Sequence, residues 1–274
     1  MTYRELWQSL ASRYTEQEAK AVARYLLEVG YGLSMADILS GASERIPDEK
    51  LAADQRRLLS GEPVQYVVGK AEFGGRLFRV TPSVLIPRPE TLELTEWEVS
   101  ECNAPERILD IGTGSGCIAV TLALAHPDAY VEGWDISNDA LEIARQNTRD
   151  LKANVSFRQS DVLGKLPTEG VVWTAIISNP PYICRKEAAE MEAHVLDHEP
   201  HQALFVPDED PLLFYRIIAQ YGRKTLTDGG WLYFEINPAC HQELTEMLDE
   251  MGYFCIETRK DQFGRFRFVR ARKA

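Results

Sequence analysis

Strand and helix patterns alternate along the chain after residue 95, and this alternation constrains the fold more than any other feature. Short apolar and β-branched runs predict strands, and the longer periodic stretches between them predict helices. We expect strands at 107–111, 129–135, 155–159, 172–178, 230–236, 254–258 and 265–271, and helices at 116–125, 139–151, 211–226 and 239–251. This order predicts an α/β fold with a seven-stranded, mostly parallel sheet, helices on both faces and an antiparallel last pair of strands.

The residues before this region divide into two further segments. Residues 1–62 show helical spacing only, with a capping box at Thr15–Glu18 and further helix starts near Ser34 and Asp48. Residues 63–95 combine β-branched runs, a Gly-Gly pair and several prolines, which predict a hairpin and a stiff connector. We therefore expect a helical bundle at 1–62, a linker at 63–95 and an α/β domain at 96–274.

The composition limits the class of partner. The net charge is −12, with 42 acidic and 30 basic side chains, which argues against a sequence-independent grip on nucleic-acid phosphates. We interpret the basic tail at 265–273 as a charged edge strand. Five cysteines without a C-x-x-C pair fit a reducing cytoplasm. The sequence contains no apolar run near the roughly 18 residues that a membrane helix needs, so we expect a soluble cytoplasmic protein.

A glycine-rich turn follows the first predicted strand of the sheet. It consists of Gly112, Thr113, Gly114, Ser115 and Gly116, and a helix follows at once. Its glycines let the backbone approach a ligand, and the helix supplies free N–H groups. The spacing is one residue short of the dinucleotide motif, which disfavours a pyrophosphate cradle.

Two carboxylates end the next two strands. Asp135 could accept the ribose hydroxyls of an adenosine ligand, and Asp161 could accept the adenine amino group. Alternatively, Asp135 caps the helix that starts near Ser137, and Asp161 is a turn residue. Together with the glycine turn, the two positions favour an adenosine ligand.

The fourth strand leads directly into Asn179-Pro180-Pro181-Tyr182, at the same edge of the sheet as the glycine turn. An amide or aromatic –NH2 is a poor nucleophile with two hydrogens to donate. The Asn179 oxygen and the Pro180 carbonyl could accept one hydrogen each, and Tyr182 could pack on the planar group. If the ligand in the first site carries a sulfonium methyl group, in-line positioning of the two reactants would supply most of the rate gain. No strong general base would be required, because the proton can leave after methyl transfer.

These residues resemble the HemK/PrmC family of release factor glutamine-N5 methyltransferases over nearly the whole chain. The resemblance is carried by Gly61-Glu62-Pro63, Leu85-Ile86-Pro87-Arg88-Pro89-Glu90-Thr91, the DIGTGSG turn, the NPPY motif, Glu199-Pro200 and Lys260-Asp261. The connector is the most telling part, since generic amino methyltransferases share NPPY but lack it. Val162 stands where the family often has a bulkier or aromatic residue.

The resemblance implies a Rossmann-like class I methyltransferase domain that uses S-adenosyl-L-methionine. The acceptor would be the glutamine in the Gly-Gly-Gln loop of class 1 peptide chain release factors, recognised with help from the N-terminal bundle. The implied cofactor-binding residues are Gly112, Thr113, Gly114, Ser115, Gly116, Asp135, Asp161, Val162 and Asn179. Asn179, Pro180, Pro181 and Tyr182 would hold the acceptor, with catalytic roles for Asn179, Pro180 and Tyr182.

Other functions share parts of this pattern. An adenine amino methyltransferase acting on nucleic acid would use the same turn and clamp on a flipped base. A non-catalytic protein that senses an adenosine ligand and docks a partner through its helical domain would need the turn without the clamp. The acidic balance argues against stable nucleic-acid binding, and Asn179 with Tyr182 argues against a non-catalytic sensor. We expect no metal site at His194, His198 and His201, and we interpret Arg88 and Glu90 as a pair that stabilises the connector.

Overall fold

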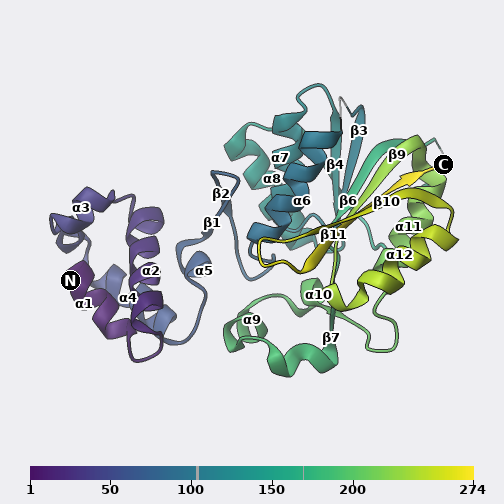
Figure 1. The fold of residues 1–274 in the computed structure, drawn as a ribbon. Coiled ribbons are helices and arrows are strands. Elements are labelled where there is room, and N and C mark those ends of the chain that lie inside the picture. The colour runs from purple at the N-terminus through teal and green to yellow at the C-terminus, as the bar shows by residue number, and fades with distance from the viewer. Residues whose placement is uncertain (103–104, 169) are drawn as a thin grey trace.

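A seven-stranded sheet organises the C-terminal part of the computed structural model, which describes residues 1–102, 105–168 and 170–274 (Figure 1). The strand order is β10-β11-β9-β6-β3-β4-β5. The strands are β3 (Arg107–Ile111), β4 (Tyr130–Asp135), β5 (Val155–Gln159), β6 (Trp173–Ser178), β9 (Leu226–Glu235), β10 (Tyr253–Lys260) and β11 (Phe266–Lys273).

The pairing confirms the expected mostly parallel sheet with an antiparallel end. Strands β5, β4, β3, β6 and β9 pair in parallel, and β11 pairs antiparallel with both β9 and β10. The prediction that the basic tail forms an edge strand is wrong, because β11 lies between β10 and β9. An arginine is tolerated inside the sheet here because Arg270 bonds Glu257 at 2.8 Å and lies over the Trp97 and Trp231 rings.

Helices cover both faces of the sheet. Neighbouring residues of a strand point to opposite faces, so Ile108 packs in one core cluster and Leu109 in the other. The first cluster includes α6 (Pro89–Glu101) and α7 (Cys117–Ala125), with α8 (Asn138–Leu151) at its margin. The second includes α11 (Leu213–Thr225) and α12 (His241–Glu250). Helix α6 was not expected, and it crosses residue 95.

The N-terminal residues form a separate helical bundle with its own core (Figure 1). Its elements are α1 (Tyr3–Leu10), α2 (Glu16–Tyr25), the π-helical turn η1 (Leu26–Gly30), α3 (Met35–Leu39), the 3₁₀ turn η2 (Ala42–Arg45) and α4 (Asp48–Leu59). Thr15 and Ser34 start α2 and α3 with capping boxes, as expected. Thr2 forms a third capping box at the start of α1.

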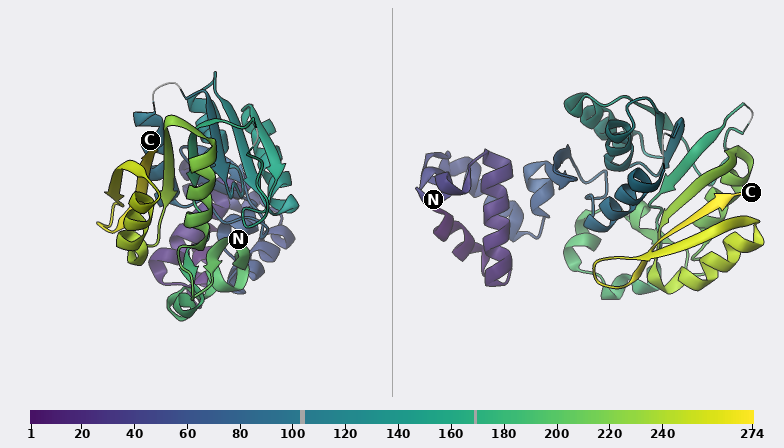
Figure 2. Two further views of the ribbon diagram at one scale, coloured as in Figure 1. Left: turned by 90° about the vertical axis from the view of Figure 1, so that its right-hand side faces the viewer. Right: turned by 45° about the horizontal axis from the view of Figure 1, so that its top comes forward.

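The connector begins with a short helix and continues as a hairpin, both of which lie between the bundle and the sheet (Figure 2). The helix α5 (Val64–Val68) was not expected, whereas the hairpin β1 (Lys70–Phe73) and β2 (Arg76–Arg79) was. Asn147 of α8 accepts a hydrogen bond from the Arg79 amide at 2.6 Å and donates to the Arg79 carbonyl at 3.1 Å. These bonds fix the end of the hairpin to the α/β domain.

A substructure that the sequence patterns did not predict follows β6. It contains β7 (Ile183–Cys184), η3 (Arg185–Glu190), α9 (Ala193–His198), α10 (His201–Leu204) and β8 (Phe205–Val206), and β7 pairs in parallel with β8. The short turn η4 (Pro238–Cys240) precedes α12. Among the described residues, no helix is both long and apolar enough to cross a membrane.

Candidate active site

The glycine turn joins β3 to α7 and is tied to the neighbouring strand. Gly112, Gly114 and Gly116 have φ values of +77°, +53° and +79°, in the left-handed region that favours glycine. The amides of Gly112 and Thr113 donate to the Trp134 carbonyl at 2.9 and 2.8 Å. The turn therefore has a fixed shape at the carboxyl end of the sheet.

The buried carboxylate of Asp110 stabilises the glycine turn by accepting two hydrogen bonds. Asp110 Oδ2 accepts from the Thr113 hydroxyl at 2.6 Å and from the Ala119 amide at 3.2 Å. Complete burial raises the pKa of Asp110 to about 7. The two bonds join the end of β3 to the first turn of α7.

Asp135 lies at the end of β4, opposite the glycine turn. Its carboxylate accepts from the Gly114 amide at 2.9 Å and from the Ser137 amide at 2.9 Å. Burial raises the pKa of Asp135, while the backbone donors oppose that shift. The cap of α8 is Ser137, whose side chain accepts from Ala140, so Asp135 is not the capping residue.

Asp161 follows β5 and is exposed. It accepts a hydrogen bond from the Leu163 amide at 2.9 Å, as expected of a turn residue, and it also lines the cavity described next. Val162 lines the same cavity and packs against the core cluster beneath α11.

A cavity of about 420 Å³ opens over the glycine turn. Small-molecule sites are typically ~300–1,000 Å³, so its size fits an adenosine ligand. The lining includes all but one of the residues that the sequence assigned to the cofactor, together with Pro180 and Pro181 and parts of the connector and α11: Ser83, Val84, Leu85, Pro87, Arg88, Thr91, Gly112, Thr113, Gly114, Ser115, Asp135, Asp161, Val162, Asn179, Pro180, Pro181, Phe214 and Ile218. Gly116 is the exception, because it is buried beneath the turn against Ala144.

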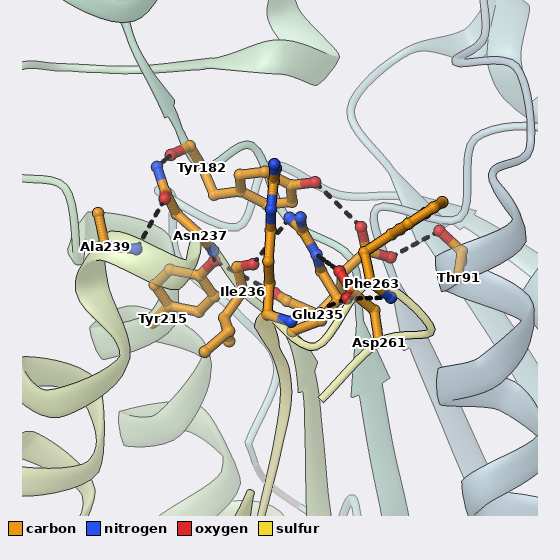
Figure 3. Close-up of polar contacts among 11 residues, drawn as sticks. Thr91, Tyr182, Tyr215, Glu235, Ile236, Asn237, Ala239, Asp261 and Phe263 are labelled. Atoms are coloured by element: carbon orange, nitrogen blue, oxygen red, sulfur yellow. Dashed lines mark hydrogen bonds and ion pairs between the residues drawn. The ribbon is translucent and has the colours of Figure 1, made fainter. Parts of the chain in front are cut away.

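The NPPY motif leaves the carboxyl end of β6 and is held by polar contacts, of which Figure 3 shows those of Tyr182, Glu235 and Thr91. Asn179 Nδ2 donates to Thr91 Oγ1 at 3.0 Å, and the Thr91 hydroxyl donates to Glu235 Oε2 at 2.6 Å. The Tyr182 hydroxyl donates to Glu235 Oε1 at 3.0 Å. Thr91 thus places the first turn of α6 against both β6 and β9.

A second cavity, of about 390 Å³, lies beside the first. Its lining comes from the connector, the NPPY motif and the segment of α9 and α10: Leu85, Arg88, Asn179, Tyr182, Ile183, Met191, Glu192, His194, Val195, Ala203 and Leu204. Asn179 lines both cavities, as do Leu85, Arg88 and Ala203. Asn179 therefore stands where the two spaces meet.

The expected pairing of Arg88 with Glu90 is wrong. Arg88 forms an ion pair with Glu199 at 2.5 Å, and Glu199 also accepts from the Ile86 amide at 3.2 Å. Arg88 caps α6 in an extended conformation, while Glu90 lies inside the first turn of the helix. The connector is thus fixed to the rim of the second cavity.

The histidine cluster makes local contacts in the structure. His201 Nε2 lies 2.8 Å from the Leu196 carbonyl, and His194 pairs with Glu192 at 3.1 Å. In the described ranges, no group of three or more His, Cys, Asp or Glu side chains could hold a metal ion.

The sequence patterns predicted no individual role for two residues at the site, Thr91 and Glu235. Thr91 is the last residue of the connector motif. Glu235 ends the apolar run of β9. A charged residue in the last position of a buried strand could have indicated a role for it. Ser83, Phe214 and Ile218, which also line the first cavity, carried no comparable signal.

Comparison with known proteins agrees with this architecture. Residues 97–205 match the family model of the methyltransferase small domain, and residues 3–69 match that of the PrmC N-terminal domain. A release factor glutamine methyltransferase of Bacteroides thetaiotaomicron is 47% identical over 97% of each chain. One of Flavobacterium psychrophilum is 37% identical over 96% of this chain and 95% of the relative.

The chain belongs to the release factor glutamine methyltransferase family.

As a member of this family the chain is a methyltransferase, and its fold is the class I methyltransferase fold. A solved methyltransferase from Pyrococcus furiosus has the same fold, with a TM-score of 0.56 and 17% identity over 81% of this chain and 99% of that chain. The family model of the methyltransferase small domain covers the glycine turn, the two aspartates and the NPPY motif. The match of the PrmC N-terminal domain covers the bundle from Tyr3 and the start of the connector, whereas Thr91 and Glu235 lie outside both matches.

Proposed function

We propose that this release factor glutamine methyltransferase family member transfers a methyl group from S-adenosyl-L-methionine to a glutamine side-chain amide nitrogen. The acceptor would be the glutamine of the Gly-Gly-Gln loop in class 1 peptide chain release factors. Family membership supports the substrate class. The observation that carries the proposal is that Asn179 lines both cavities and so can contact a cofactor on one side and an acceptor on the other.

The first cavity would hold the cofactor. Asp135 is a hydrogen-bond acceptor suited to the ribose hydroxyls, and Asp161 lines the same space as an acceptor for the adenine amino group. The glycine turn offers backbone without side chains, and Val162 adds an apolar wall. When bound, S-adenosyl-L-methionine supplies an electrophilic methyl group on a positively charged sulfur.

Asn179 would orient the acceptor in the second cavity. Its Nδ2 is bonded to Thr91, and its Oδ1 accepts no hydrogen bond from the described residues. Oδ1 can therefore accept one amide hydrogen of the acceptor, and the carbonyl of Pro180, which lines the first cavity, would accept the other where the two cavities meet. Pro181 stiffens the motif. Tyr182 lines the second cavity, where the planar amide would pack against its ring.

Asn179, Pro180 and Tyr182 would act by positioning the acceptor amide relative to the methyl donor. Holding two reactants in line contributes ~7–11 kcal/mol in well-oriented systems. The nitrogen forms its bond to the methyl carbon as the carbon–sulfur bond breaks, and the nitrogen then loses a proton to water. No strong base is needed before transfer.

The division of the chain follows the same proposal. Residues 1–62 would recognise the protein substrate, residues 63–95 would join the two parts, and residues 96–274 would carry the reaction. Deleting residues 1–62 should then weaken binding of the release factor more than binding of the cofactor.

Transfer of labelled methyl groups tests the proposal. The protein is incubated with labelled S-adenosyl-L-methionine and either a class 1 release factor or duplex DNA. Label in the release factor is the expected result. Label in the DNA alone would show an adenine amino methyltransferase instead, and cofactor binding without any transfer would show a non-catalytic sensor.

A further inference from the structure

Glu235 is a buried carboxylate that accepts hydrogen bonds from Thr91 and Tyr182 (Figure 3). It lies at the carboxyl end of β9 and is 1% exposed. One oxygen accepts from Thr91 and the other from Tyr182. Arg267 attracts Glu235 electrostatically, but its guanidinium pairs with Asp261 at 3.2 Å. Burying a carboxylate costs free energy, so the presence of one at this position calls for a role.

That role is not contact with a ligand. The side chains that line the two cavities in the described part of the chain do not include Glu235. Both of its oxygens already accept hydrogen bonds from protein groups. Glu235 can therefore act on the reaction only through Thr91 and Tyr182.

The Glu235 carboxylate sets the donor and acceptor roles in the hydrogen bonds that run from Asn179 through Thr91 to Glu235. An ionised carboxylate only accepts hydrogen bonds, and a threonine hydroxyl has a single proton to donate. Because Thr91 donates that proton to Glu235, its oxygen can only accept from Asn179. Asn179 must then turn its –NH2 toward Thr91 and its oxygen away from it.

The Tyr182 hydroxyl supports the same arrangement. Burial and the negative charge of Glu235 raise the pKa of Tyr182, so its hydroxyl stays protonated and donates to Glu235. Burial raises the pKa of Glu235, whereas the hydrogen bonds from Thr91 and Tyr182 and the positive charge of Arg267 oppose that shift and favour the ionised form. With a hydrogen from each side, the carboxylate has no proton to give to Thr91.

We propose that Glu235 is a positioning residue that fixes the orientation of the Asn179 amide through Thr91, and thereby makes the site select an amide over a carboxylate. The inference rests on the proposed function, in which Asn179 Oδ1 accepts a hydrogen from the acceptor amide. An oxygen at that point attracts –NH2 and repels a carboxylate. With the amide reversed, the –NH2 of Asn179 would attract a carboxylate, and a glutamate would bind in place of glutamine.

Four variants separate this role from a structural one. Glu235→Gln keeps the shape of the side chain but can donate to Thr91, and Thr91→Val removes the hydroxyl while keeping the volume. Thr91→Ser keeps the hydroxyl. Thr95→Val is the matched control, because it removes a buried hydroxyl one turn further along α6 that, among the residues the structure describes, bonds only the Thr91 carbonyl, at 2.8 Å.

The measurements are kcat, KM, cofactor affinity and the ratio of affinities for two release factors. One release factor carries the natural glutamine, and the other carries glutamate at that position. In Glu235→Gln and Thr91→Val we expect kcat to fall ~10- to 100-fold and the preference for glutamine over glutamate to shrink by a similar factor. Cofactor affinity should change less than about twofold, and Thr91→Ser should recover the preference that Thr91→Val loses.

A purely structural role would lower kcat or the melting temperature without changing the glutamine-to-glutamate ratio. That result in both Glu235→Gln and Thr91→Val, or an equal loss of preference in Thr95→Val, would overturn the inference. Wild-type protein that binds the cofactor but does not methylate the release factor would overturn the proposed function as well. Wild-type transfer with variants of unchanged preference would overturn the inference alone.

Discussion

The Thr91 hydroxyl donates to Glu235 Oε2 at 2.6 Å, across 144 positions of the sequence. The contact joins the first turn of α6 to the carboxyl end of β9, and Asn179 at the end of β6 bonds the same hydroxyl. The connector is therefore part of the site as well as the link to the bundle.

Replacing Asn179 with Ala should reduce turnover while leaving the cofactor site intact. The variant loses the amide oxygen proposed to hold the acceptor, and loss of one such oriented group typically lowers kcat ~100- to 1,000-fold. Steady-state kinetics would measure the loss, and calorimetry with S-adenosylhomocysteine would show binding within a few-fold of wild type. Turnover that survives the change would disprove the clamp.

Asp135 should matter more for cofactor affinity than Asp161. Asp135 accepts from two backbone amides, so an amide side chain in Asp135→Asn would turn a donor toward one of them. The Asp161 carboxylate accepts from the backbone amide of Leu163, and Asp161→Asn can keep that bond through its amide oxygen. Calorimetry should show a ~10- to 100-fold loss for Asp135→Asn and a smaller one for Asp161→Asn. The reverse order would contradict the assignment.

Gly116→Ala should destabilise the protein more than Gly69→Ala. Both glycines have left-handed backbones, with φ of +79° and +75°, so both substitutions carry a backbone cost of ~1–2 kcal/mol. An added Cβ at Gly116 would lie 3.1 Å from Ala144 Cβ, whereas at Gly69 it would meet open space. Thermal or urea denaturation of the two variants measures the difference, and equal losses would contradict the packing argument.

The buried Asp110 should make the stability of the fold depend on pH. Its pKa is about 7 in the folded chain against 3.8 ordinarily, so between these values the folded chain holds a proton that the unfolded chain has released. Stability should therefore fall as pH rises from about 4 to about 7 and level off above, by at most about 4 kcal/mol from this group.

Asp110→Asn isolates that contribution. Its oxygen can keep the bonds to Thr113 and Ala119, while its nitrogen takes the place of Oδ1, which has no partner among the described residues. Urea denaturation at several pH values should show a smaller decline for the variant than for wild type. Parallel curves for the two proteins would rule out Asp110 as the source.

The central strands of the sheet were readable from the sequence as short apolar runs, and the edge strand β5 was readable from the alternation of apolar and polar residues at its start. Strands β3 and β5 were predicted with their observed bounds. Helix α6 was missed because its buried face includes Thr91, Thr95 and Glu98, which interrupt the apolar spacing that marks a helix. Proline at its first turn was the signal that remained.

The site was predicted where its residues follow strand ends and missed where it depends on distant pairs. The glycine turn, Asp135 and the NPPY motif share one edge of a parallel sheet, which topology alone brings together. The contacts of Thr91 with Glu235 and of Arg88 with Glu199 join residues more than a hundred positions apart. Neither periodicity nor local spacing encodes such pairs.

Locating the transferred methyl group tests the central claim most directly. A class 1 release factor is incubated with the protein and S-adenosyl-L-methionine, digested and sequenced by tandem mass spectrometry. We predict one added methyl group, on the side-chain nitrogen of the glutamine in the Gly-Gly-Gln loop. A methyl group on any other residue, or an unmodified release factor beside wild-type protein that binds the cofactor, would contradict the account.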